Sequence, residues 1–226
     1  MLLMFDCDGV LVDSETIAAK VDAEHLNEIG FAITPEEVIR RFAGLTSLDI
    51  AEVVEAEIGR TLPNDFLEKQ RIELDRRLAK EVQAVAGVHE LLDRLEGPRC
   101  VCSNSSGERL KITMERTKLY DRFTPYIFSA VEVGTKKPKP APDVYLYGME
   151  QFRSAPRDSI VIEDSVFGVT AARSAGCRVV GFTGGGHAWP GLAELLTGAG
   201  AETVINRLAD LPKVIEAFMA WDGMVD

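Results

Sequence analysis

The sequence has too few basic residues for a protein that binds nucleic acid or an anionic membrane surface. Its 226 residues include 25 lysines and arginines against 36 aspartates and glutamates, which gives a formal charge of −11. Binding to a polyanion requires a basic face, and neither residues 14–85 nor the rest of the chain has a basic excess. The sequence therefore predicts neither a nucleic acid nor a membrane as partner.

Cysteine, histidine and long apolar runs are also scarce. The four cysteines form no C-x-x-C pair and have no zinc-site spacing with the three histidines. No apolar run approaches the roughly 18 residues of a membrane helix, and the opening MLLMF is too short for a secretory signal. Hydrophobic residues nevertheless make up 46% of the chain, which suffices for a folded core. We expect buried free thiols and a cytoplasmic location.

Short apolar runs alternate with amphipathic helical stretches over most of the chain. The helical stretches cover about 87–96, 106–117, 143–152, 166–175, 190–198 and 207–220. This alternation predicts an α/β fold, a Rossmann-like doubly wound parallel sheet with helices on both faces. The expected strands are Leu2–Phe5, Arg99–Cys102, Tyr126–Ser129, Ser159–Ile162, Arg178–Phe182 and Glu202–Ile205.

Residues 15–82 interrupt the alternation, because they contain helical patterns only, at about 14–29, 36–42, 47–58 and 64–82. Thr34 followed by Pro35 is typical of a helix N-terminus. We therefore expect an α/β core domain of residues 1–14 plus 83–226, with a helical cap domain of residues 15–82 inserted after the first strand. The hinges of such a cap are expected near residues 13–16 and 81–87.

Four polar clusters follow the predicted strands. Taken singly, each is equally well explained as a turn or a helix cap. Taken together they are more informative, because the carboxyl ends of parallel strands meet at one edge of a sheet, where ligands bind. The clusters are Asp6-Cys7-Asp8-Gly9, Ser103-Asn104-Ser105, Lys139-Pro140-Ala141-Pro142-Asp143 and Glu163-Asp164-Ser165.

Carboxylates gathered at one edge repel one another unless a positive charge lies among them. Carboxylate oxygens favour Mg²⁺, and Lys139 supplies a point charge suited to a phosphate. Hydroxyl groups at a helix N-terminus, as in Ser103-Asn104-Ser105, also suit a phosphate. The combination predicts a phosphoryl-transfer site, where positioning and charge neutralisation supply most of the catalysis.

The four clusters resemble, in the same order, the four motifs of the haloacid dehalogenase superfamily. Residues 4–15, MFDCDGVLVDSE, resemble its first motif, D-x-D-G-[TV]-L-x-D-[ST]. Ser103-Asn104 resembles the second motif, residues 139–143 the third and residues 163–176 the fourth. The helical insert is similar to the small helical cap of the β-phosphoglucomutase-like branch of this superfamily.

The resemblance implies a reaction and a set of roles. It makes Asp6 the nucleophile that forms an aspartyl-phosphate, and Asp8 the general acid that later acts as the base. Dehalogenases lack the second aspartate of the first motif, so Asp8 argues against dehalogenation. The resemblance further implies that Ser103, Asn104 and Lys139 hold the phosphoryl group, and that Mg²⁺ binds Asp6, the backbone carbonyl of Asp8, Asp164 and, through a water, Glu163.

Two departures from the pattern of the phosphomutases in this branch favour hydrolysis over phosphoryl transfer within one molecule. Phosphomutases of this branch carry a histidine at the position of Ala18 and an arginine in a cap loop G-V-S-R, which here reads Gly44-Leu45-Thr46-Ser47. We expect a Mg²⁺-dependent phosphatase, a phosphoric monoester hydrolase, acting on a small phosphorylated metabolite such as a sugar phosphate or phospho-sugar acid. A phosphomutase of the β-phosphoglucomutase type is the alternative.

Substrate selection is expected in the cap, above all in residues 40–46. Arg41 is a candidate to pair with a second anionic group of the substrate, or simply a cation that suits a helix C-terminus. Thr46 is the other specificity candidate. The stretch Arg41-Phe42-x-Gly44 resembles that of 6-phosphogluconate phosphatases in this branch. His187 and Trp189, after three glycines, are expected to be solvated or to pack.

Overall fold

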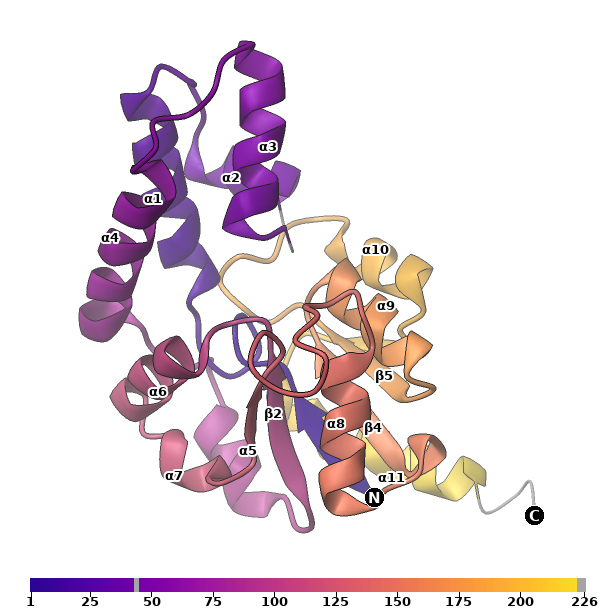
Figure 1. The fold of residues 1–226 in the computed structure, drawn as a ribbon. Coiled ribbons are helices and arrows are strands. Elements are labelled where there is room, and N and C mark those ends of the chain that lie inside the picture. The colour runs from indigo at the N-terminus through magenta and orange to yellow at the C-terminus, as the bar shows by residue number, and fades with distance from the viewer. Residues whose placement is uncertain (43–44, 223–226) are drawn as a thin grey trace.

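A six-stranded parallel sheet forms the centre of the molecule in the computed structural model, which describes residues 1–42 and 45–222 (Figure 1). The strand order is β3-β2-β1-β4-β5-β6, so the first strand lies in the middle, between β2 and β4. The expected doubly wound α/β fold is confirmed. The strands are β1 Leu2–Phe5, β2 Arg99–Ser103, β3 Ile127–Ser129, β4 Ser159–Glu163, β5 Arg178–Phe182 and β6 Thr203–Ile205.

Helices cover both faces of the sheet, which explains why the middle residues of its strands are apolar. Side chains of β1 alternate between two hydrophobic clusters, with Leu3 and Phe5 in one and Leu2 and Met4 in the other. The first cluster includes α5 Val88–Arg94, α6 Gly107–Arg116, α7 Tyr120–Phe123 and α11 Leu211–Asp222, and the second includes α8 Asp143–Phe152, α9 Val166–Ser174 and α10 Leu192–Ala199.

Four further helices stand beyond the carboxyl ends of the strands (Figure 1). They have a hydrophobic cluster of their own, which includes Leu26, Phe42, Val54 and Phe66. The chain enters and leaves these helices side by side, because the Asp13 amide donates to the Gln83 carbonyl at 2.9 Å. The helices are α1 Glu15–Glu28, α2 Pro35–Phe42, α3 Ser47–Ile58 and α4 Phe66–Glu81.

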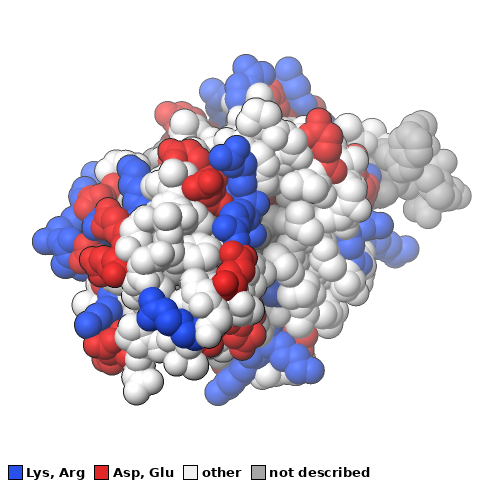
Figure 2. All heavy atoms as spheres, turned by 90° about the horizontal axis from the view of Figure 1, so that it is seen from above, with Lys and Arg blue, Asp and Glu red and all other residues white. Residues whose placement is uncertain are grey.

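The start of α2 follows the expected capping pattern. The Glu37 amide donates to the Thr34 hydroxyl at 3.2 Å, and the Glu37 carboxylate accepts from the Thr34 amide at 2.8 Å. The face seen from above, over these helices, carries interspersed acidic and basic side chains (Figure 2). None of the described helices is long and apolar enough to cross a membrane.

Candidate active site

A pocket of about 490 Å³ lies between the carboxyl edge of the sheet and the helices α1–α4. All the residues singled out from the four clusters line it: Asp6, Asp8, Ser103, Asn104, Lys139, Glu163 and Asp164. They come from the ends of β1, β2 and β4 and from the loop before α8. The two halves of the sheet, β3-β2-β1 and β4-β5-β6, meet between β1 and β4. In folds of this kind, ligands bind at the carboxyl ends of the strands at that position.

Lys139 is the central cation of the pocket. Its ammonium donates to Asp6 Oδ1 at 2.5 Å, to Glu163 Oε1 at 2.6 Å and to the Cys102 carbonyl at 2.7 Å. Burial by itself lowers the pKa of Lys139, but the Asp6 and Glu163 carboxylates outweigh burial and raise it. Lys139 therefore stays charged and offsets part of the negative charge at the sheet edge.

Asp6, Glu163 and Asp164 are placed as metal ligands would be. Each offers a carboxylate oxygen, and these oxygens all lie within 4.8 Å of one another. Burial raises the pKa of Asp6 well above its ordinary value, and the charges of Glu163, Asp164 and Asp8 raise it further against the opposing effect of Lys139. A site of buried oxygen donors with excess negative charge fits Mg²⁺.

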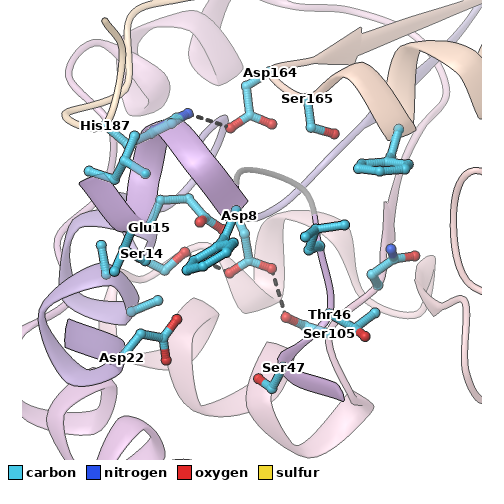
Figure 3. A pocket seen from close by; sticks show the side chains of 18 of the residues that line it. Asp8, Ser14, Glu15, Asp22, Thr46, Ser47, Ser105, Asp164, Ser165 and His187 are labelled. Carbon is cyan, nitrogen blue, oxygen red and sulfur yellow. Dashed lines mark hydrogen bonds and ion pairs between the residues drawn. The ribbon is translucent and has the colours of Figure 1, made fainter. Parts of the chain in front are cut away.

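Asp8 accepts hydrogen bonds from three hydroxyl groups. Ser14, the residue before α1, donates to Oδ1 at 2.6 Å, while Ser105 and Ser103 donate to Oδ2 at 2.8 and 3.2 Å. Figure 3 shows the Asp8 carboxylate pointing into the pocket between Ser14 and Ser105. The side chain is thus oriented from both sides by hydroxyl groups.

Asn104 holds the loop that carries Lys139. Its carbonyl oxygen accepts from the Lys139 amide at 2.8 Å, and its amide group donates to the Lys139 carbonyl at 3.3 Å. Ser103 and Ser105 do not cap α6 as a simple turn explanation requires. Ser106 does so, by accepting from the Arg109 amide, which leaves Ser103 and Ser105 directed at Asp8.

Glu163 is fully buried, and both of its carboxylate oxygens accept hydrogen bonds. Its Oε1 accepts from Tyr145 at 2.8 Å in addition to Lys139, and its Oε2 accepts from the Asp164 and Ser165 amides at 3.1 and 3.2 Å. This network fixes the position of the neighbouring Asp164.

His187 belongs to the site, contrary to the expected solvated or packing role. It is 7% exposed, and its Nε2 donates to Asp164 Oδ2 at 2.9 Å (Figure 3). Burial lowers the pKa of His187, but the hydrogen bond and the charge of Asp164 raise it to about 9. The sequence signal was weak, because only the path of the loop after β5 brings this side chain to Asp164.

The comparisons with known proteins agree with this geometry. The family model described as haloacid dehalogenase-like hydrolase matches residues 3–182. The chain belongs to the haloacid dehalogenase-like hydrolases. A 6-phosphogluconate phosphatase of Escherichia coli (strain K12) is 30% identical over 221 residues, which cover 97% of this chain and 96% of that protein.

Two solved structures of haloacid dehalogenase-like proteins have the same fold. A conserved protein of unknown function from Agrobacterium tumefaciens str. C58 is 48% identical with a TM-score of 0.91, over 96% of this chain and 98% of that one. A hydrolase from Deinococcus radiodurans R1, with bound phosphate and sodium, is 30% identical with a TM-score of 0.80, over 96% and 95%. The expected enzyme class, a phosphoric monoester hydrolase, is confirmed by these relatives.

The two cap candidates in this haloacid dehalogenase-like chain have partners of their own. Arg41 lines the pocket, but its guanidinium donates to Glu57 at 2.5 Å and lies over the rings of Phe31 and Phe42. Thr46 lines the pocket and also caps α3. Of the expected specificity segment 40–46, residues 43 and 44 lie outside the described residues.

Proposed function

We propose that the protein is a Mg²⁺-dependent phosphatase that hydrolyses a sugar phosphate or a phospho-sugar acid through an aspartyl-phosphate on Asp6. The observation that carries the proposal is the position of Asp6. Its carboxylate contacts Lys139 and offers a ligand atom beside Glu163 and Asp164, at the base of a pocket that Asp8 also faces. The name of the Escherichia coli relative, which shares nearly the full length, supports the substrate class.

The first half of the reaction transfers the phosphoryl group to the protein. A carboxylate oxygen of Asp6 attacks phosphorus, the bond from phosphorus to the ester oxygen breaks, and Asp8 gives its proton to that oxygen. Ser103 and Asn104 lie beside the path of the transferring group, and the Lys139 ammonium provides positive charge there. Mg²⁺ held by Asp6, Asp164 and the Asp8 carbonyl would neutralise charge as the two anions approach.

The second half releases phosphate. The ionised Asp8 takes a proton from water, the water oxygen attacks phosphorus, and the bond from phosphorus to Asp6 breaks. Inorganic phosphate leaves, Asp6 is again a carboxylate and Asp8 again carries a proton. The hydroxyls of Ser14 and Ser105 hold Asp8 in position for both transfers.

The pocket wall supports hydrolysis rather than phosphoryl transfer back to the product. Ala18 lines the pocket at the position where mutases carry a histidine, and it offers no group that transfers protons. The phosphomutase alternative predicts an isomerised sugar phosphate and little free phosphate, so one phosphate assay with a sugar monophosphate separates the two activities.

The arrangement of the helices supports a division into a core of residues 1–14 plus 83–226 and a cap of residues 15–82. In this proposal the cap closes over the pocket and excludes water during the first transfer. Four buried free cysteines are consistent with the reducing cytoplasm as the location.

The decisive experiment replaces the nucleophile. Asp6→Asn should lower Mg²⁺-dependent hydrolysis of p-nitrophenyl phosphate by about 10³-fold or more, because the amide cannot form the covalent intermediate. Asp121→Asn, at an exposed position of α7, is the matched control and should retain wild-type turnover. Asp6→Asn protein that is folded by circular dichroism yet turns over normally would contradict the mechanism.

A further inference from the structure

A second polar group lines the pocket within α1–α4. The Gln70 amide nitrogen, on α4, donates to Asp22 Oδ1 on α1 at 2.5 Å and to the Ser47 hydroxyl at the start of α3 at 3.2 Å. Gln70 is 5% exposed, and all three residues line the same pocket as Asp6. Figure 3 shows Asp22 and Ser47 facing the space beside Asp8.

Asp22 and Gln70 present acceptors to a ligand, and Ser47 presents a hydroxyl that can both accept and donate. Both hydrogens of the Gln70 amide are used by Asp22 and Ser47. Asp22 Oδ2 and Gln70 Oε1 accept no hydrogen bond from the residues that the structure describes. Burial raises the pKa of Asp22, while the hydrogen bond from Gln70 opposes that effect. Acceptors of this kind suit hydroxyl groups and repel a carboxylate.

The arginines of the pocket do not reverse this preference. Arg71 and Arg109 both contact Asp75, at 3.3 and 2.8 Å, and Arg41 contacts Glu57. Arg40 is exposed and donates to a backbone carbonyl. Three of the four guanidinium groups therefore contact carboxylates, with Arg71 and Arg109 sharing Asp75, and among the described residues none of the four forms an ion pair with Asp22.

Helix α1 sets the distance between the two ends of the pocket. Ser14, which contacts Asp8, and Asp22 are eight residues apart, or about 12 Å along a helix. Ala18 lies midway on the same side and is small. An extended chain advances about 1.2 Å per bond, so the eight bonds from phosphorus to the terminal oxygen of a six-carbon phosphate span about 10 Å. That length fits between the two ends.

We propose that Asp22, Ser47 and Gln70 bind the hydroxyl groups at the far end of an open-chain polyol phosphate of about six carbons. Asp22 selects a terminal CH₂OH group over a terminal carboxylate. This inference rests on the proposed function, because it specifies the substrate of the same pocket. Among small phosphorylated metabolites, it moves the preferred substrate from the phospho-sugar acids to chains that end in a neutral hydroxyl group.

Two substrates of equal length test the proposal directly. Sorbitol 6-phosphate and 6-phosphogluconate differ only in the terminal group, and p-nitrophenyl phosphate has no polyol chain. We expect kcat/KM of the wild type to be about tenfold or more higher for sorbitol 6-phosphate than for 6-phosphogluconate, since a hydrogen bond to a charged group carries at least that preference. Asp22→Asn should remove the preference mainly through KM, and leave p-nitrophenyl phosphate turnover within about twofold.

Controls distinguish recognition from folding. Glu28→Gln changes an exposed carboxylate on the same helix and should keep the wild-type preference. Gln70→Leu should weaken binding of sorbitol 6-phosphate while sparing p-nitrophenyl phosphate. If either variant fails to fold, the substrate preference of the wild type still tests the proposal.

Three outcomes overturn the inference. The first is a wild type that prefers 6-phosphogluconate or treats both chains alike, and the second is an Asp22→Asn variant that loses all three activities equally while folded. In both cases, hydrolysis of p-nitrophenyl phosphate by the wild type leaves the proposed function intact. If the wild type hydrolyses none of the three with Mg²⁺, the proposed function and this inference fail together.

Discussion

At the scale of single residues, Lys139 shows how one side chain serves both stability and chemistry. It is the cation that contacts both Asp6 and Glu163, and all three are buried. Removing one partner of such a group leaves charges buried without compensation, which costs far more than the ion pair itself contributes.

Lys139→Met should therefore lose both activity and stability. We expect the free energy of unfolding to fall by about 3–5 kcal/mol, as measured by urea denaturation, and phosphatase turnover to fall by at least about 100-fold. Lys136→Met, at an exposed position three residues earlier, should change neither by a measurable amount. A Lys139→Met protein with wild-type stability would show that the carboxylates are neutral without it.

His187 gives the metal-free protein a defined dependence on pH. Its pKa in the folded protein is about 9, above its ordinary value of 6.5. Its contribution is therefore fully present below pH 6.5 and is lost as the pH rises through about 9. That shift corresponds to about 3 kcal/mol at most.

The prediction is tested by unfolding in EDTA between pH 6 and 9.5. Wild-type stability should decline across this range, and the decline should be smaller in His187→Asn. Burial also raises the pKa of Glu15, to about 8. This group therefore lowers the stability of both proteins further as the pH rises. His89→Asn serves as the control and should follow the wild type, whereas parallel curves for wild type and His187→Asn would contradict the assignment.

At the scale of elements, the close packing of α9 against the end of β4 positions the acidic site. A Cβ atom on Gly168 would lie 1.8 Å from Glu163 Oε1, although the backbone there is ordinary helix. The position thus requires glycine for space rather than for conformation.

Gly168→Ala should destabilise the protein, while the same change in a neighbouring helix should not. Gly198 lies in α10 with no atom within 4 Å of its Cβ position, so Gly198→Ala should raise stability by up to about 1 kcal/mol through helix propensity. Gly168→Ala should lower stability by about 1–3 kcal/mol and weaken Mg²⁺ binding, measured by calorimetry. Equal effects of the two substitutions would refute the packing argument.

Most elements followed from local patterns, and the differences have physical causes. Strands such as β1 and β5 matched their apolar runs. The short helix α7 was not predicted, because four residues carry no helical period. The last helix begins at Leu211 rather than near 207, because a 3₁₀ turn at Leu208–Asp210 precedes it.

The candidate site was predictable where the motif residues follow strand ends, and less so elsewhere. Asp6 and Asp164 converge because parallel strands share an edge. The pairing of Arg41 with Glu57, and of His187 with Asp164, joins segments whose relative position no local pattern encodes. The same holds for Gln70 and Asp22, which are 48 residues apart.

At the scale of the whole molecule, the acidic excess divides into two kinds of carboxylate. On the face seen from above, over α1–α4, the carboxylates are mixed with basic groups (Figure 2). At the sheet edge of the pocket, Asp6, Asp8, Glu163 and Asp164 lie beside Lys139 and His187, the two basic residues buried in the described part of the chain. When these six groups are charged, two negative charges remain, which one divalent cation would balance.

Mg²⁺ should accordingly stabilise the entire fold. At about 100 times its dissociation constant, a ligand that binds only the folded state adds about 2.7 kcal/mol, which raises Tm by about 5–11 °C for a chain of this size. The measurement is thermal unfolding in EDTA and in Mg²⁺. Asp164→Asn should unfold at the same Tm in both, and a wild type insensitive to Mg²⁺ would argue against the metal.

Helix α1 connects the two ends of the pocket as one continuous helix. Ser14, the residue before the helix, contacts the proton-transferring carboxylate, and two turns later the helix carries Asp22. The helix therefore holds both groups at a fixed separation. A ligand bound at Asp22 is thus kept at a set distance from the hydroxyl that orients Asp8, so that the length of the chain, as well as its terminal group, governs how tightly a substrate binds.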